Sequence, residues 1–260
     1  MPLDWLVPEW PAPAGVCAVC TSRAGGHSAP PYDSLNLGDH VGDDTLAVGA
    51  NRALLAQALG AQPVFLQQVH GAGVVELGPH TPHGTVADAC YTRERGVACT
   101  IMVADCLPLL FTDTRGSFVA AAHAGWRGLA GQGGVGVLEA VCKLFPTSSL
   151  LGKAQDATEI IAWLGPCIGP QAFEVGPEVK AAFEGHDPQS AACFRPAAAP
   201  GKWLADLPAL ARQRLAALGI KRVYGNDGSA PWCTVSNPSR FFSHRRDGVS
   251  GRLAACIWRA

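Results

Sequence analysis

The chain of 260 residues is 48% hydrophobic and only 16% charged, and its mean hydropathy lies just above zero. A chain this apolar is not expected to stay disordered, and its length is sufficient to bury a substantial core. Twenty basic and twenty-one acidic residues give a formal charge of −1. No overall field would attract nucleic acid or an anionic membrane, so we expect neither as a partner.

The sequence gives no sign of a membrane span or a secretory leader. Its apolar runs, such as residues 98–104 and 118–122, fall far short of the roughly 20 residues that cross a bilayer. The first sixteen residues hold four prolines and lack a basic start followed by an apolar stretch. Ten cysteines are scattered through apolar stretches, where most are expected to be small buried residues. We therefore expect a cytoplasmic protein.

Two helices are indicated by the residues at their ends. The first is expected to start after Asp43 and Asp44 and to stop at Gly60, and the second to run from Asp206 to Gly219. Residues rich in β-formers predict strands at 63–69, 98–103, 117–122, 159–164, 221–224 and 252–258. Turn residues between 184 and 201 predict a surface excursion. Because strands and helices do not alternate regularly, we predict an α+β fold: a single domain, residues 1–260, of layered mixed β-sheets flanked by helices.

Three of the predicted strands run into a reactive side chain that has glycine or proline close behind it. These side chains are His70, Cys106 and His123, which strand ends would bring to one rim of a sheet. Imidazole and thiolate are the ligands that zinc prefers, so the three residues could hold one ion. Three protein ligands would leave a fourth position open for water or substrate, as in catalytic zinc sites.

The same residues allow other interpretations. In a metal-free cysteine hydrolase, Cys106 would be the nucleophile, His123 its base, and Asp105 or another acid the group that orients the histidine. Each proposed metal ligand, taken alone, is also typical of an ordinary packed residue. Their spacing is too long and irregular for a compact zinc signature, so only convergence in space would favour a metal site.

Basic and polar residues near glycines suggest where an anion could bind. Arg23 is followed closely by two glycines, and Asn36 lies between apolar residues nearby. A guanidinium beside open backbone amides can hold phosphate or carboxylate. Arg245 and Arg246 precede another glycine turn and could do the same. An ordinary turn at the first segment and a surface Arg–Asp pair at the second remain open.

Six phrases occur in the order that is typical of the laccase-domain family, also called the polyphenol oxidase or YfiH-like family. They are Ser34-Leu35-Asn36-Leu37-Gly38, Gln68-Val69-His70-Gly71, Ala104-Asp105-Cys106-Leu107-Pro108, Ala121-Ala122-His123-Ala124-Gly125-Trp126-Arg127-Gly128, Gly165-Pro166-Cys167-Ile168-Gly169-Pro170 and Ser243-His244-Arg245-Arg246-Asp247. The chain resembles this family over nearly its whole length. One difference is the link after Gly128, where residues 129–137 replace a shorter Leu-Ala-Gly-Gly-Val; this bears on the shape of the pocket near the metal.

The resemblance implies a zinc ion held by His70, Cys106 and His123, with copper as the alternative metal. It implies purine nucleoside phosphorylase activity on adenosine, inosine, guanosine and methylthioadenosine, accompanied by adenosine deaminase activity. Members of the family are also described as copper-dependent polyphenol oxidases, and some bacterial members are linked to the editing of peptidoglycan precursors. The alternatives to a phosphorylase are therefore the cysteine hydrolase, acting on such a precursor, and the copper oxidase.

A mechanism follows as a hypothesis. In deamination, zinc would activate a water for attack on the ring carbon that carries the amino group. Phosphorolysis needs a basic clamp for phosphate, which Arg23 or one of Arg245 and Arg246 could supply. Asp105 could accept a proton or orient a histidine. With only two methionines, the chain is a poor match to a blue-copper oxidase. The residues expected to contact substrate or phosphate are Arg23, Asn36, Arg127, Arg245 and Arg246.

Overall fold

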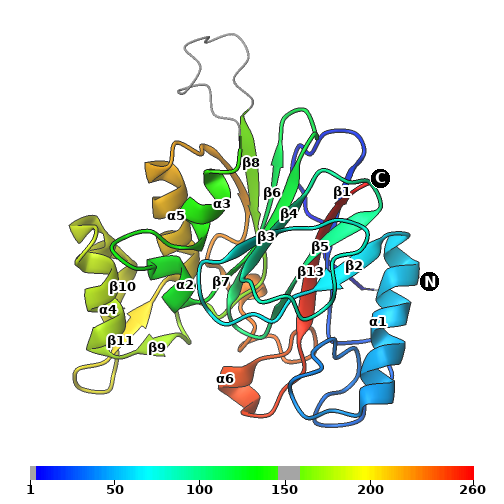
Figure 1. Ribbon diagram of the computed structural model, residues 1–260. Coiled ribbons are helices and arrows are strands. Elements are labelled where there is room, and N and C mark those ends of the chain that lie inside the picture. Colours follow the sequence, from blue (N-terminus) through cyan, green and yellow to red (C-terminus); the bar gives the residue numbers. More distant parts are fainter. Residues whose placement is uncertain (1–3, 146–158) are drawn as a thin grey trace, which may run out of the picture.

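Strand β5 (Val97–Val103) shows how the apolar runs of the sequence build the centre of the fold. All seven of its residues are buried. Successive side chains of a strand point to opposite faces, so Cys99 and Ile101 enter one apolar core while Ala98 and Met102 enter another. The computed structural model describes residues 4–145 and 159–260 (Figure 1). Residues 1–3, the start of the segment considered for a leader, lie outside the described residues.

The first sheet has four strands in the order β1-β13-β5-β2. Its other strands are β1 (Val16–Cys20), β13 (Leu253–Arg259) and β2 (Gln62–Phe65). Helix α1 (Thr45–Leu59) covers its outer face (Figure 1), where Leu55 and Leu59 pack against Phe65 and Met102. The inner face of this sheet packs against the second sheet.

The second sheet has six strands in the order β12-β8-β6-β7-β4-β3. They are β12 (Arg222–Gly225), β8 (Ile160–Leu164), β6 (Leu107–Asp113), β7 (Val119–Ala124), β4 (Ala89–Thr92) and β3 (Val74–Glu76). Alternation places Val119 and Ala121 between the two sheets and Ala120 and Ala122 on the opposite face. Strand β7 is therefore buried on both faces.

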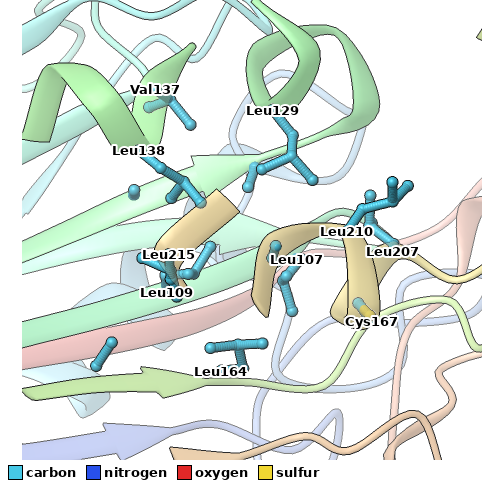
Figure 2. Packing of buried hydrophobic residues seen from close by; sticks show 14 of the residues in the cluster. Leu107, Leu109, Leu129, Val137, Leu138, Leu164, Cys167, Leu207, Leu210 and Leu215 are labelled. Carbon is cyan, nitrogen blue, oxygen red and sulfur yellow. The ribbon is translucent and has the colours of Figure 1, made fainter. Parts of the chain in front are cut away.

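Short helices and a third sheet cover the outer face of the six-stranded sheet. The helices are α2 (Trp126–Ala130), α3 (Val137–Cys142), α4 (Pro177–Glu184) and α5 (Leu207–Ala217). The small sheet has the order β10-β11-β9, from β10 (Phe194–Pro196), β11 (Trp203–Ala205) and β9 (Glu174–Val175). Leu107 and Leu109 of β6 pack under Leu210 and Leu215 of α5 (Figure 2). The remaining short elements are η2 (Pro188–Cys193), η3 (Ala230–Trp232) and α6 (His244–Asp247).

The α+β fold class and both predicted helices are confirmed. Asp44 caps α1 by accepting from the amide of Leu46, and Gly60 ends it in the left-handed conformation with φ of 61°. Asp206 caps α5 in the same way, by accepting from the amide of Ala209. None of the helices formed by the described residues is both long and apolar enough to cross a membrane.

One predicted strand is shorter than expected, and several elements were not anticipated. The strand expected over residues 63–69 ends at Phe65. Beyond it the side chain of Gln68 replaces the backbone pairing, because its amide donates to the carbonyl of Met102 and accepts from the amide of Met102, each at 2.8 Å. The segment from residue 184 to 201 is a surface excursion, but it also contributes η2 and β10. Strand β6 has no counterpart among the predicted strands.

Candidate metal centre

Three segments of the chain bring His70, Cys106 and His123 together, and we call these residues the ligand cluster. His70 lies between β2 and β3, Cys106 between β5 and β6, and His123 within β7. Their side-chain nitrogen and sulfur atoms all lie within 4.8 Å of one another, and Cys106 Sγ is 3.7 Å from His70 Nε2. His123 lies inside a strand instead of beyond its end, and its parity with Ala121 directs it between the two sheets.

Two glycines make the room that this cluster needs. A Cβ atom on Gly125 would lie 2.9 Å from His70 Cδ2 and 3.0 Å from Cys106 Sγ. A Cβ atom on Gly128 would lie 2.6 Å from the carbonyl oxygen of Gly71. Any larger residue at either position would displace the loop that carries His70. The glycines of the His-Ala-Gly-Trp-Arg-Gly motif are thus explained by close packing against the loop that carries His70.

Asp88, which the sequence did not single out, holds both histidines. Its fully buried carboxylate is 2.8 Å from His123 Nδ1 and accepts the backbone amide of His70 at 2.8 Å. It also accepts the amides of Gly71 at 2.7 Å and Val69 at 3.2 Å. Burial raises the pKa of Asp88, but the hydrogen bonds from His123 and Gly71 outweigh this effect and leave the pKa lowered. An ionised Asp88 therefore fixes the orientation of His123 and the backbone around His70.

The thiol and imidazole of the cluster polarise one another. Burial raises the pKa of the Cys106 thiol. The charge of His123 and the hydrogen bonds from His123 and His70 outweigh this effect and lower the pKa to about 6. Burial lowers the pKa of His123, while the Cys106 thiolate and the hydrogen bond to Asp88 raise it to about 9. Cys106 is thereby favoured as a thiolate, the form that binds metals and attacks electrophiles.

The donor set fits a zinc ion. Zinc takes imidazole nitrogen and thiolate sulfur in a tetrahedron, in which ligand atoms lie roughly 3.3–3.6 Å apart. The 3.7 Å between Cys106 Sγ and His70 Nε2 is close to that spacing. Asp88 anchors Nδ1 of His123, which leaves Nε2 of that ring for the ion. Among the described residues, the ligand cluster is the one group of three or more His, Cys, Asp or Glu side chains that lie close enough together to share an ion.

The ligand cluster faces a cavity of about 480 Å³. Two arginines, Arg245 and Arg252, and two further histidines, His40 and His244, line it together with apolar Phe173. The apolar walls could hold a flat ring and the basic residues an anion. Ile168 also lines the cavity, so the Gly165–Pro170 loop forms part of its wall.

Asp105 precedes Cys106 and also lines the cavity, but its carboxylate is bonded to other segments of the chain. Its carboxylate accepts the hydroxyl of Thr234 at 2.6 Å and the backbone amide of Arg245 at 2.6 Å. Its φ of 91° is rare for a residue other than glycine, and such strain is concentrated at functional sites. These contacts fix the start of α6 against the cavity; the histidine is oriented by Asp88 instead. A role of Asp105 in proton transfer stays a prediction.

The expected phosphate-binding residues are dispersed in the structure. Arg245 lines the cavity, whereas Arg127 stacks on Trp126 beside a separate pocket that shares His70 with the first. Arg23 donates to the carbonyls of Asp33 and Pro238. Arg246 donates to the carbonyls of Thr234, Val235 and Phe241 and forms an ion pair with Asp247. The side-chain amide of Asn36 is hydrogen-bonded through both its nitrogen and its oxygen. Their direct contact with a substrate stays a prediction.

The lengthened link after Gly128 forms a tight turn away from the cavity. Gln132 and Val135 bridge across it, and Arg214 of α5 donates to the carbonyls of Ala130 and Gly134. Residues of this turn line the separate pocket beside Arg127.

All ten cysteines are free, and seven are buried, as expected for thiols in apolar strands.

Fold and site together define a mixed α/β protein with a His–Cys–His cluster, suited to a metal, at the edge between two sheets. Residues 17–260 match the family described as multi-copper polyphenol oxidoreductase laccase, and the chain belongs to this laccase-domain family.

Similar proteins extend over the same length. A purine nucleoside phosphorylase of Pseudomonas aeruginosa is 50% identical, with 98% of each chain covered. The purine nucleoside phosphorylase YfiH of Escherichia coli is 47% identical, covering 97% of this chain and 98% of YfiH. The crystal structure of the Neisseria meningitidis protein NMB0706 superposes with a TM-score of 0.88 at 44% identity, covering 98% of this chain and 99% of that one.

Proposed function

We propose that this protein is a zinc-dependent purine nucleoside phosphorylase that acts on adenosine, inosine, guanosine and methylthioadenosine, and that it also deaminates adenosine. The observation that carries the proposal is the ligand cluster at the base of a cavity lined by arginines. Relatives that are 47–50% identical over nearly the whole chain are named purine nucleoside phosphorylases, which supports the same activity. Purine nucleosides and inorganic phosphate would be its substrates.

Phosphorolysis sets clear demands on the cavity. An oxygen of phosphate forms a bond to C1′ of the ribose, and the bond from C1′ to N9 of the purine breaks with its electron pair passing to the base. A proton reaches the base, so the products are ribose 1-phosphate and the free purine. Basic groups must hold phosphate near C1′ while positive charge develops on the sugar. The cavity provides Arg245 and Arg252 for that purpose.

The protein would hold zinc through His70, Cys106 and His123. The ion would supply a Lewis acid and a water of lowered pKa, which is the chemistry that deamination requires. Zinc is favoured over a blue-copper site because such a site adds a weak methionine ligand. Met102 lines the cavity, but its sulfur lies 3.9 Å from Nη2 of Arg52, a contact with another side chain.

The proposal is tested by measuring the metal and the reaction in the same preparation. Protein purified without added metal should contain zinc by elemental analysis and should convert inosine and phosphate to hypoxanthine and ribose 1-phosphate. Cys106→Ala should lose both the zinc and the activity. Cys17→Ala, on the edge strand β1 outside the cavity, is the matched control and should retain both. Stoichiometric metal together with persistent turnover in Cys106→Ala would show the assignment to be wrong.

A second candidate is a metal-free cysteine hydrolase that acts on a peptidoglycan precursor. One observation favours it: Cys106, His123 and Asp88 form a chain of interacting groups in the order nucleophile, base and orienting acid. Chelation separates the two candidates. A thiol hydrolase should keep its activity after the metal has been removed, whereas the zinc-dependent phosphorylase should lose it and regain it with zinc.

A further inference from the structure

Arg252, which directly precedes β13, lines the same cavity as the ligand cluster. Its side chain is half-buried, whereas Arg245, the other arginine of the cavity, is exposed and donates to the carbonyl of Glu174 at 2.9 Å. Burial lowers the pKa of Arg252, and the negative charges of Cys106 and Asp105 oppose this effect. Arg252 is thus the more buried of the two arginines that line the cavity of the ligand cluster.

Among the described residues, the Arg252 guanidinium has hydrogen-bond partners at only one of its three nitrogens. Nη1 donates to the carbonyls of Ser250 at 2.8 Å and Gly251 at 3.1 Å. Within residues 4–145 and 159–260, Nε and Nη2 donate to no other group, and the side chain forms no ion pair with a carboxylate. The carboxylate of Asp105 is already occupied by the Thr234 hydroxyl and a backbone amide. The remaining donors of Arg252 are available to an anion in the cavity.

The segment around Asn36 holds Arg252 in this position. The side-chain oxygen of Asn36 accepts the amide of Arg252 at 2.8 Å, and the amide of Leu37 donates to the carbonyl of Arg252 at 3.2 Å. A Cβ atom on Gly38 would lie 2.7 Å from Cγ of Arg252, so glycine is required here by a contact. His40 lines the same cavity, and burial together with the charge of Arg252 lowers the pKa of its imidazole.

We propose that Arg252 binds the phosphate co-substrate next to the ligand cluster, and that Asn36 and Gly38 are positioning residues that hold its side chain there. The inference rests on the proposed phosphorylase function and identifies the phosphate-binding residue of that site. Arg252 donates from Nε and Nη2 to two phosphate oxygens, and a third oxygen attacks C1′ of the nucleoside. The requirement for asparagine and glycine in the Ser-Leu-Asn-Leu-Gly motif then has a physical cause.

The first test compares zinc-loaded wild type, Arg252→Ala and Arg252→Lys in inosine phosphorolysis. Loss of charge-assisted hydrogen bonds should raise the KM for phosphate about tenfold to a hundredfold in Arg252→Ala. The KM for inosine and the zinc content should stay within about twofold of wild type, and Arg252→Lys should recover part of the affinity for phosphate. Arg222→Gln removes from the edge strand β12 a partly exposed arginine that pairs with Glu159, and it should change neither KM.

Two results would overturn the inference: an unchanged KM for phosphate in Arg252→Ala, or equal rises in the KM for phosphate and for inosine. Failure of the proposed function is a separate result, because wild type would then form no ribose 1-phosphate. In that case, calorimetric titration of the zinc-loaded protein with inorganic phosphate still tests Arg252. Binding should be present in wild type and lost in Arg252→Ala, and equal binding by both would reject the site.

A second variant tests the positioning role of Gly38. In Gly38→Ala the new methyl group should push the Arg252 side chain aside and raise the KM for phosphate without changing the KM for inosine. The added methyl group should have much less effect in the Arg252→Ala background, since no guanidinium remains to be displaced. Additive effects in this double-mutant cycle would show that Gly38 acts independently of Arg252.

Discussion

Replacing Asp88 by asparagine should weaken zinc binding without removing any metal ligand. One carboxylate oxygen of Asp88 serves His123 and the amide of His70, and the other serves the amides of Val69 and Gly71. In the amide, whichever position receives the NH₂ group faces two N–H donors that lose their acceptor. Each unsatisfied buried donor costs about 1–3 kcal/mol, so the free energy of unfolding should fall by about 2–6 kcal/mol. The loss of orienting contacts should reduce zinc affinity by about 10–100-fold.

Competition with a chromophoric chelator measures the zinc affinity, and urea denaturation of the zinc-free proteins measures stability. Glu76→Gln is the matched control, because it removes a carboxylate that is 57% exposed, pairs with Arg93 and belongs to neither the ligand cluster nor its cavity lining. It should leave both quantities near the wild-type values. If Asp88→Asn binds zinc within about twofold of wild type, Asp88 does not orient the histidines as described.

Three further outcomes follow from the same structure. Gly125→Ala places a methyl group within 3.0 Å of both His70 and Cys106, so we expect zinc affinity to fall about tenfold; an unchanged affinity in chelator competition would contradict the crowding argument. Leu109→Ala removes a fully buried side chain beneath α5 and should cost about 2–5 kcal/mol in urea denaturation. It should leave zinc stoichiometry intact, and a cost below about 1 kcal/mol would count against the packing in Figure 2. Chelation of wild type should lower the thermal midpoint, and Zn²⁺ but not Mg²⁺ should restore it; equal midpoints before and after chelation would argue against a bound ion.

Local chemistry explains why parts of the fold could be predicted from the sequence. Asp44 and Asp206 are capping residues whose partners lie two or three residues away, so the helix starts are encoded by neighbouring positions. Strand β6 escaped prediction because Pro108 interrupts its apolar run. Helix α2 has only five residues and depends on packing against β7, which no local pattern reports.

The same distinction applies to the site. His70, Cys106 and His123 could be singled out because each follows or ends an apolar run. Asp88 could not, since its hydrogen-bond partners lie 17 to 35 positions away along the chain. A signal was present in the single acid between Ala87 and Ala89, because a lone carboxylate within an apolar stretch needs partners from elsewhere.

His70 and Cys106 both lie on connections that leave the four-stranded sheet and enter the six-stranded one, while His123 belongs to the second sheet itself. An ion bound by all three residues would link the two sheets. The complete binding site would exist only after the sheets have packed together. Misregistered or half-assembled chains would lack it. At a free zinc concentration a thousandfold above the dissociation constant, the assembled form would gain about 4 kcal/mol over the unfolded chain, so the zinc supply would set the stability of the protein as well as its chemistry.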